Sequence, residues 1–336
     1  MKILWQSRSS KVMQAFYEGM KRIKIDSQNS YDARAALALA KHFKIEIDPQ
    51  TILKKESLFS YWRRLFAYRP KADLLIVGQF PLVFGQKKRS LKSIAVLHQI
   101  DYASMRKNGL HRLYIKRLLS KAKKCDAVVT VSEHWKIFFQ INGCKNIKLI
   151  YNSFELEKYS LLSEDETQFR NRNGIPLDKK IIYLGNNLHD KGVVEAIEIM
   201  MNTNYHLVVT DCKHIPKQFK IQNLHLSQTE YLSLLKISSL VFSFANLADK
   251  WNYIAHEALL SKTPLVGIYD NGKNELLDNA GQLIVSDMDE LKLTVEKVVN
   301  EREKYSTLGH NYISQFDEKY FENSWVDLVN EIMTEK

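Results

Sequence analysis

The sequence predicts an α/β protein with two doubly wound parallel sheets, one in each half of the chain. Short runs rich in Ile, Val and Leu alternate with helical patterns, and the alternation stops near the middle of the chain and then restarts. Nearly continuous apolar runs of this length are typical of strands that are buried on both faces of a sheet. Alternation of such strands with helices implies crossover connections, which make the strands parallel.

The first half of the chain contains five predicted strands. They are MKILW (1–5), DLLIVG (73–78), SIAVLHQ (93–99), DAVVTVS (126–132) and IKLIYN (147–152). Between them lie helical patterns, of which the clearest are YDARAALALAKHF (31–43), SYWRRLFAY (60–68) and MRKNGLHRLYIKRLLSKAKK (105–124). We therefore predict a Rossmann-like domain over residues 1–155, followed by a polar linker over residues 156–178.

The second half repeats the alternation. Its predicted strands are IIYLG (181–185), YHLVVTD (205–211), SLVFSF (239–244), PLVGIY (264–269) and QLIV (282–285). Helices are predicted through VVEAIEIMM, TEYLSLLKIS and NYIAHEALLSK. The pattern predicts a second Rossmann-like domain over residues 179–318. An amphipathic helix at 319–336 has no strand before it, and we expect it to pack back on the N-terminal domain.

The composition is that of a globular protein. The chain has 336 residues, more than the roughly 100–200 of one domain, and 45% of them are hydrophobic. No apolar stretch approaches the roughly 18 residues of a membrane-spanning helix, and the start lacks the apolar region of a signal peptide, so we expect a cytoplasmic protein. Cys125, Cys144 and Cys212 match no zinc pattern, so we expect reduced thiols and no metal.

Charge is divided unevenly along the chain. Residues 1–150 contain 30 Lys and Arg against 10 Asp and Glu, whereas residues 151–336 contain 19 against 28. This indicates a polyanionic partner for the first half, such as a membrane surface, a phosphorylated acceptor or nucleic acid. Leucines among basic residues in the pattern 105–124 favour peripheral association with the inner face of the plasma membrane. The alternative is that these leucines face the core; for nucleic acid the chain shows no recognition motif.

Residues directly after the strands are candidates for a site, because open parallel sheets bind ligands beyond the carboxyl ends of their strands. After IIYLG the chain forms a glycine-bounded turn, GNNLHDKG (185–192), with Lys191 in the first turn of the next helix. Backbone amides and a lysine at a helix start suit a diphosphate. A solvated loop is the alternative for this segment.

Three further side chains lie at predicted strand ends. Asp249 and Glu257 stand on either side of the turn between SLVFSF and the next helix, where carboxylates can accept hydrogen bonds from sugar or ribose hydroxyl groups. Helix capping by Asp249 and a surface salt bridge of Glu257 are the ordinary alternatives. His98 ends another strand, where a neutral imidazole can donate one hydrogen bond and accept another; a bond to a backbone carbonyl is its commoner role.

Together, these residues and the segments around them resemble the retaining, nucleotide-sugar-dependent glycosyltransferases of GT-B architecture, in the group usually numbered four. DAVVTVSEHWK resembles the family strand and its "VSE" turn, and LIYNSFELEKY resembles the family junction "IPNGVDLEKF". HEALLSKTPLVG resembles "LEAMACGTPVVA", and NGKNE stands where "GGIPE" is usual. The resemblance covers nearly the whole chain and is specific mainly from about residue 126 to 320. It implies two Rossmann-like domains that face each other across a cleft.

The resemblance implies a role for each matching residue. Lys191 would contact the donor diphosphate, and Glu257 would hold the nucleotide ribose. As the catalytic pair, Asp249 would touch the donor sugar near its reacting carbon, and His98 would approach that sugar from the N-terminal domain. The other implied donor-binding residues are Gly185, Asn186, Asn252 and Glu275.

The chain departs from the family pattern in three places. Asn186 stands where the family has an arginine, and Asp249 is one methylene shorter than the usual glutamate and lacks the glycines that normally follow it. The glycine-rich loop after the first strand is missing, and WQSRSSKVM offers Arg8, Ser9 and Lys11 as phosphate contacts instead. We expect Arg8 or Lys11 to replace the charge lost at Asn186; unchanged donor affinity in both alanine variants would disprove this.

The implied reaction moves a sugar from a UDP- or GDP-linked donor to a hydroxyl of a glycan or lipid-linked acceptor in cell-surface polysaccharide or glycolipid synthesis, with the anomeric configuration kept. Helix-terminal amides and Lys191 would stabilise the departing diphosphate, without a metal or other cofactor. The alternatives are a catalytically inactive partner or sugar-binding subunit of the same fold, and another sugar-nucleotide enzyme such as an epimerase.

Overall fold

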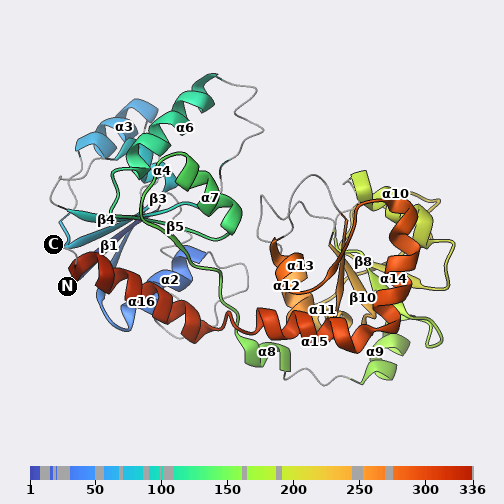
Figure 1. Cartoon of the computed structure of the whole chain (residues 1–336). Coiled ribbons are helices and arrows are strands. Elements are labelled where there is room, and N and C mark those ends of the chain that lie inside the picture. Colours follow the sequence, from blue (N-terminus) through green and yellow to red (C-terminus); the bar gives the residue numbers. More distant parts are fainter. Residues whose placement is uncertain are drawn as a thin grey trace. The chain divides into compact units, whose positions relative to one another are not determined.

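The computed structural model of the protein divides into two compact units, both drawn in Figure 1. The first unit comprises Met1–Ser153 and Glu318–Lys336, and the second comprises Phe154–Asp317. The structure describes residues 1–7, 16–17, 20, 31–49, 57–67, 71–85, 91–98, 100, 109–160, 165–186, 191–243, 253–268 and 275–334.

The first unit contains a six-stranded parallel sheet in the order β2-β1-β3-β4-β5-β6. Its strands are β1 (Lys2–Ser7), β2 (Lys44–Pro49), β3 (Leu74–Gly78), β4 (Lys92–Val96), β5 (Ala127–Thr130) and β6 (Ile147–Leu149). In β1, Trp5 lies opposite Ile47 of β2 on one side and Ile76 of β3 on the other. The central strands are buried almost throughout, because both of their faces are covered by helices.

Helices pack on both faces of this sheet (Figure 1). They are α2 (Tyr31–Ala40), α3 (Leu58–Ala67), α4 (Gln79–Phe84), α6 (Gly109–Ala122), α7 (Glu133–Ile141) and the C-terminal α16 (Glu318–Thr334). One core cluster joins α2 and α16 to Trp5 and Ile76, and a second cluster on the other face joins α4, α6 and α7 to Leu4 and Leu75.

The C-terminal helix α16 is fixed to the first unit by aromatic packing. Trp325 is fully buried, and its ring centroid lies 5.5 Å from that of Trp5 on β1. Phe321 packs edge-on against Tyr31 of α2, with 5.2 Å between the ring centroids. The last residues of the chain therefore complete the core of the unit that the first residues begin.

The second unit contains a six-stranded parallel sheet in the order β12-β11-β10-β7-β8-β9. Its strands are β7 (Ile181–Tyr183), β8 (His206–Thr210), β9 (Gln222–Leu224), β10 (Leu240–Ser243), β11 (Leu265–Ile268) and β12 (Leu283–Val285). Its helices are α8 (Leu156–Ser160), α9 (Glu166–Asn173), α10 (Lys191–Met200), α11 (Gln228–Ile237), α12 (Tyr253–Leu260), α13 (Glu275–Asn279), the short 3-10 helix η1 (Met288–Glu290), α14 (Leu291–Asn300) and α15 (Arg302–Ile313). The core cluster of one face joins α10 and α14 to the strands.

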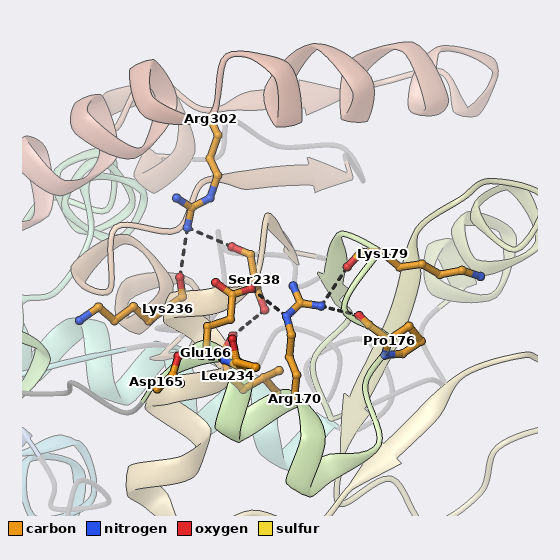
Figure 2. A network of polar contacts seen from close by, with 10 residues as sticks. Asp165, Glu166, Arg170, Pro176, Lys179, Leu234, Lys236, Ser238 and Arg302 are labelled. Atoms are coloured by element: carbon orange, nitrogen blue, oxygen red, sulfur yellow. Dashed lines mark hydrogen bonds and ion pairs between the residues drawn. The ribbon is translucent and has the colours of Figure 1, made fainter.

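The segment 156–178, predicted as a linker, contains α8 and α9, and both belong to the second unit. Arg170 of α9 is buried, and its guanidinium donates to Glu166 Oε1 at 2.7 Å and to the carbonyl oxygens of Pro176 and Lys179 at 2.7 and 2.9 Å (Figure 2). A buried guanidinium needs such partners, because desolvation without them is costly. The network fixes the turn that leads into β7.

The predicted fold class, two Rossmann-like units with parallel sheets, is confirmed. The sequence did not predict β2 and β9, which both lie at sheet edges. In β2 charged residues alternate with Ile45 and Ile47, and β9 has only three residues, so neither gives a continuous apolar run. No helix in the described ranges is both long and apolar enough to cross a membrane.

Candidate functional site

The strand order of the second sheet marks a binding crevice. The chain runs outward from β7 through β8 to β9, and then outward from β10 through β11 to β12, so its direction reverses between β7 and β10. Doubly wound sheets bind ligands at the carboxyl ends of the two strands that flank such a reversal. The predicted donor-site residues that follow these two strands in the chain are Gly185, Asn186, Lys191, Asp249, Asn252 and Glu257.

The turn after β7 begins at Gly185, whose φ of +90° lies in the region that favours glycine. Its carbonyl oxygen accepts a hydrogen bond from the Thr210 amide at 3.1 Å, which ties the turn to the end of β8. A Cβ atom on Gly185 would lie 3.9 Å from Ile254 Cδ1 in the first turn of α12. The turn after β7 and the helix after β10 are therefore neighbours, and Asn186, the next residue, is exposed.

Helix α10 begins at Lys191, six residues after that glycine. Its first amides have no partner within the helix, and its dipole is positive at this end, so a phosphate group suits the position. A Cβ atom on Gly192 would lie 3.2 Å from Ile268 Cγ2, which shows how closely the helix start approaches the end of β11. The Lys191 side chain lies outside the described part of the structure, so its contact with a diphosphate stays a prediction.

Glu257, in the second half of α12, is only 7% exposed. The Tyr159 hydroxyl of α8 donates to its Oε1 atom at 3.5 Å. The charge of Glu257 also reaches two more tyrosines. Burial of the hydroxyl first, and then the Glu257 carboxylate, raise the pKa of Tyr231, and burial first and then the same carboxylate raise the pKa of Tyr183. This burial does not fit the surface salt bridge that was the ordinary alternative for Glu257.

Of the other predicted residues of the donor and phosphate sites, the structure describes only Glu275. Glu275 is the first residue of α13, is half-buried and follows β11. Asp249 and Asn252 lie outside the described residues of the second unit, and the predicted phosphate contacts Arg8, Ser9 and Lys11 lie outside those of the first. Within the described ranges, no group of three or more His, Cys, Asp or Glu side chains could hold a metal ion.

His98 lies just beyond β4, at the carboxyl edge of the first sheet. The amide of Leu97 still donates to the carbonyl oxygen of Val129 at 2.9 Å, so the chain stays in line with β5 up to this point. The reversal of this sheet falls between β1 and β3, and β4 is the neighbour of β3. The side chain of His98 is 37% exposed, which leaves part of the ring accessible to a ligand.

The structure joins His98 to Asp32, a residue that the sequence did not single out. Nε2 of His98 lies 3.1 Å from Oδ1 of Asp32 in the first turn of α2, and its ring packs edge-on against Tyr31 at 4.7 Å between centroids. A carboxylate at Nε2 favours a proton on that nitrogen and leaves Nδ1 as the acceptor of the neutral ring. His98 is thus held by a carboxylate and not by a backbone carbonyl, which was the ordinary alternative for this histidine.

The first unit also exposes apolar side chains on its basic helices. Phe59 of α3 and Leu110 and Leu113 of α6 are 81%, 76% and 64% exposed. The exposed basic residues of the same two helices include Arg63, Arg112 and Lys116. Both helices contact α4 (Figure 1). By contrast, Ile115 and Leu118 of α6 are buried, so part of the leucine pattern serves the core and only part of it faces solvent.

At the level of sequence, no family model matches the chain, and a comparison with curated proteins finds no match. At the level of structure, the chain resembles solved proteins over its whole length. A sucrose-phosphate synthase from Thermosynechococcus elongatus has a TM-score of 0.68 and 12% identity, with 99% of each chain covered. HepE from Anabaena, in complex with UDP, has a TM-score of 0.67 and 16% identity, with 98% of this chain and 100% of that chain covered. HepE has also been solved with UDP-glucose.

Two further similar structures have different described activities. WaaG, a glycosyltransferase involved in lipopolysaccharide biosynthesis, has a TM-score of 0.62 and 13% identity, with 100% of both chains covered. A proposed UDP-N-acetylglucosamine 2-epimerase from Listeria monocytogenes has a TM-score of 0.58 and 13% identity, with 98% of this chain and 96% of that chain covered. Identities this low establish the fold alone, and that fold is the two-domain GT-B fold.

Proposed function

We propose that this protein is a retaining glycosyltransferase. It would move a sugar from a UDP- or GDP-linked donor to a hydroxyl group of a glycan or lipid-linked acceptor in cell-surface polysaccharide or glycolipid synthesis. The observation that carries the proposal is that the Gly185 turn, the start of α10 and the helix bearing the buried Glu257 all follow the strands at the reversal of the second sheet. A nucleotide sugar suits this arrangement, because its diphosphate fits the helix start and its ribose hydroxyl groups can donate to the carboxylate.

In this proposal the chain acts through charge and position. The amides of α10 and Lys191 would stabilise the negative charge that develops on the departing diphosphate. Asp249 and His98 would hold the donor sugar, and Asp32 would keep the imidazole in one orientation while Nδ1 accepts a hydrogen bond from a sugar hydroxyl. No metal or other cofactor is part of this proposal.

The proposed acceptor lies at an anionic membrane surface. The exposed Phe59, Leu110 and Leu113, together with the basic residues on the same helices, support contact with such a surface, because aromatic and aliphatic side chains enter the headgroup region while Lys and Arg attract anionic lipids. A lipid-linked or lipopolysaccharide-type acceptor would then be available where the protein binds.

Two other functions have specific support. The exposed Asn186, at the position of a family arginine, favours a catalytically inactive partner or sugar-binding subunit. The similarity to an epimerase favours another reaction of sugar nucleotides on the same fold. Transfer to an acceptor, or hydrolysis of the donor, separates an enzyme from an inactive partner. A changed sugar configuration within the nucleotide, formed without an acceptor, identifies an epimerase.

The first experiment is a thermal-shift screen of the full chain with UDP, GDP, ADP and their sugars. A ligand at 100 times its dissociation constant adds about 2.7 kcal/mol to the free energy of unfolding, so the donor should raise the melting temperature measurably. The stabilising donor is then incubated with candidate glycan and lipid-linked acceptors, and the anomeric configuration of the product is read by NMR. The proposal fails if no nucleotide stabilises the protein, or if the product has the inverted configuration.

A further inference from the structure

The second unit contains a pocket of about 610 Å³, and none of the described residues that line it is assigned to the donor. Its walls come from α8, the C-terminal ends of α11 and α12, and α15. Helix α12 starts after the carboxyl end of β10 and ends before the amino end of β11. Its last turn therefore lies near the amino ends of the strands, whereas the donor residues follow the carboxyl ends. Small-molecule sites commonly have volumes of about 300–1,000 Å³.

The pocket is basic, although the unit around it is acidic. Residues 154–317 contain 17 Lys and Arg against 23 Asp and Glu. The charged residues of the pocket wall are Lys236, Lys262, Arg302 and Glu157, and His310 lies among them. The C-terminal ends of α11 and α12 add about half a negative charge each. Within the wall, the three cations therefore exceed the negative charge by about one unit, which favours an anionic ligand. The Glu166 charge also reaches Arg302, but Glu166 is paired with Arg170 at 2.7 Å.

Arg302 is held in place at one side of the pocket. Its Nη2 atom donates to the carbonyl oxygens of Lys236 at 3.1 Å and Ser238 at 3.2 Å, at the C-terminal end of α11 (Figure 2). Burial lowers the pKa of Arg302, and the Glu166 charge partly opposes that effect. The guanidinium stays charged because the intrinsic pKa of arginine is very high. The two carbonyl bonds engage one of its three nitrogen atoms, and Nε and Nη1 carry the donors that a ligand would use.

We propose that this pocket binds a phosphorylated small molecule, a phosphate monoester whose remaining part is at least partly apolar. The phosphate would accept hydrogen bonds from Arg302, Lys236 and Lys262, since charged donors are the strongest partners of phosphate oxygens. The rest of the molecule would contact Leu156 and Leu260, which form apolar parts of the wall.

Tyr159 connects this pocket to Glu257. It lines the pocket, and its hydroxyl donates to Glu257 Oε1 at 3.5 Å. A molecule bound in the pocket would therefore contact the side chain that orients the carboxylate assigned to the ribose. This connection rests on the proposed function, whereas the binding of the phosphate ester does not.

The test is calorimetric titration of the full chain with phenyl phosphate, and with phenol and inorganic phosphate as its two parts. The wild-type protein should bind one equivalent of phenyl phosphate, more tightly than either part. Combining Lys236→Gln with Lys262→Asn should weaken binding about tenfold or more, because two charged contacts are lost. Asn is chosen at position 262 because Lys262 has a φ of +58°, which Asn tolerates better than most residues. Lys292→Gln, on an exposed position of α14, is the matched control and should bind as the wild type does.

Two outcomes would overturn the proposal: no saturable binding by the wild-type protein, or equal affinity of the wild-type protein and the double variant. Thermal shifts with the nucleotides are measured on the same proteins. Stabilisation by a nucleotide without binding of phenyl phosphate removes this proposal and leaves the proposed function. Binding of phenyl phosphate that depends on Lys236 and Lys262, without stabilisation by any nucleotide, removes the proposed function and leaves the pocket.

Discussion

The imidazole of His98 and the carboxylate of Asp32 lie 3.1 Å apart, between the end of β4 and the first turn of α2. Tyr31, next to Asp32, packs edge-on against the same imidazole, and its hydroxyl donates to the carbonyl oxygen of Ile150 at 2.9 Å. The core of the first unit thus fixes the carboxylate, and the carboxylate fixes the histidine. A ligand at this sheet edge would meet an imidazole that is already oriented, which reduces the entropy lost on binding.

Asp32→Asn should lower the rate of sugar transfer and leave donor affinity nearly unchanged. The amide can still occupy the space of the carboxylate, but it no longer favours a proton on Nε2, so the tautomer and orientation of His98 are lost. Misplacement of a group at the reacting centre costs up to about 10²-fold, and we expect a fall in kcat of about 10- to 100-fold with little change in KM.

The control for this change is Asp73→Asn, which alters an exposed carboxylate of the same unit that accepts from the Lys2 amide at 2.7 Å. It should transfer sugar at the wild-type rate. A wild-type kcat in Asp32→Asn would show that the pair is structural only. A His98→Ala variant that loses no more activity than Asp32→Asn would show that the two residues act as one unit.

Glu257→Gln should weaken binding of the nucleotide without destabilising the free protein. Replacing a buried carboxylate by an amide removes charged hydrogen bonds to the ribose, each worth about 1.5–3 kcal/mol, so the dissociation constant should rise about 10- to 100-fold. The melting temperature of the free protein should not fall, because a buried charge is removed.

Tyr159→Phe should produce a smaller rise in the same dissociation constant, since it removes only the hydroxyl that donates to Glu257 Oε1. Glu198→Gln, on an exposed position of α10, should leave the constant unchanged. Equal nucleotide affinity in Glu257→Gln and the wild type, measured by thermal shift, would mean that this carboxylate does not hold the ribose.

The fold was predictable because its signal is local. Central strands such as β3 and β5 are buried on both faces, so each gives a continuous apolar run, whereas edge strands such as β2 mix charged and apolar residues. Turns after strands could also be predicted, because the chain order alone shows that Gly185 follows a strand. The sequence could not show which leucines of α6 are buried and which are exposed, since the same leucine pattern contains the buried Leu118 and the exposed Leu113.

The partners of the site residues could not be predicted, because they come from distant parts of the chain. Asp32 is 66 positions from His98, and an acidic residue in the first turn of a helix is also what the helix dipole alone favours. Tyr159 is 98 positions from Glu257 and lies in a segment predicted as a linker. The packing of α2 against the first sheet and of α8 against α12 brings these pairs together.

Glu322 makes the attachment of α16 depend on pH. Burial alone would raise the pKa of this carboxyl group, but hydrogen bonds and positive charge from Lys41 and His42 outweigh that effect and lower it from 4.5. A lowered pKa in the folded state means that the carboxylate stabilises the protein above its unfolded pKa, and that this contribution is lost as the pH falls through the folded value. Glu322→Gln should therefore be less stable than the wild type at pH 7, by about 0.5–1 kcal/mol, and the difference should shrink as the pH falls below 4.5.

Urea denaturation at several pH values, followed by the fluorescence of the buried Trp5 and Trp325, measures this difference. Asp327→Asn, at an exposed position of the same helix, is the control and should not show the same pH dependence. A difference between Glu322→Gln and the wild type that stays constant between pH 7 and pH 3 would rule out the ion pairs as its source.

The exposed apolar side chains of α3 and α6 should bind the protein to anionic vesicles. In sedimentation at low salt, the wild-type protein should bind vesicles that contain phosphatidylserine, and binding should fall as salt screens the basic residues. Combining Leu110→Gln with Leu113→Gln should lower the partition coefficient at least about tenfold, because burying each leucine in the headgroup region contributes up to roughly 1.5–3 kcal/mol. Ile141→Gln is the matched control, since Ile141 is 79% exposed but lies at the end of α7, and it should bind as the wild type does. Absence of binding, binding that is indifferent to salt, or equal losses in both variants would each show that these helices do not form a membrane-binding surface.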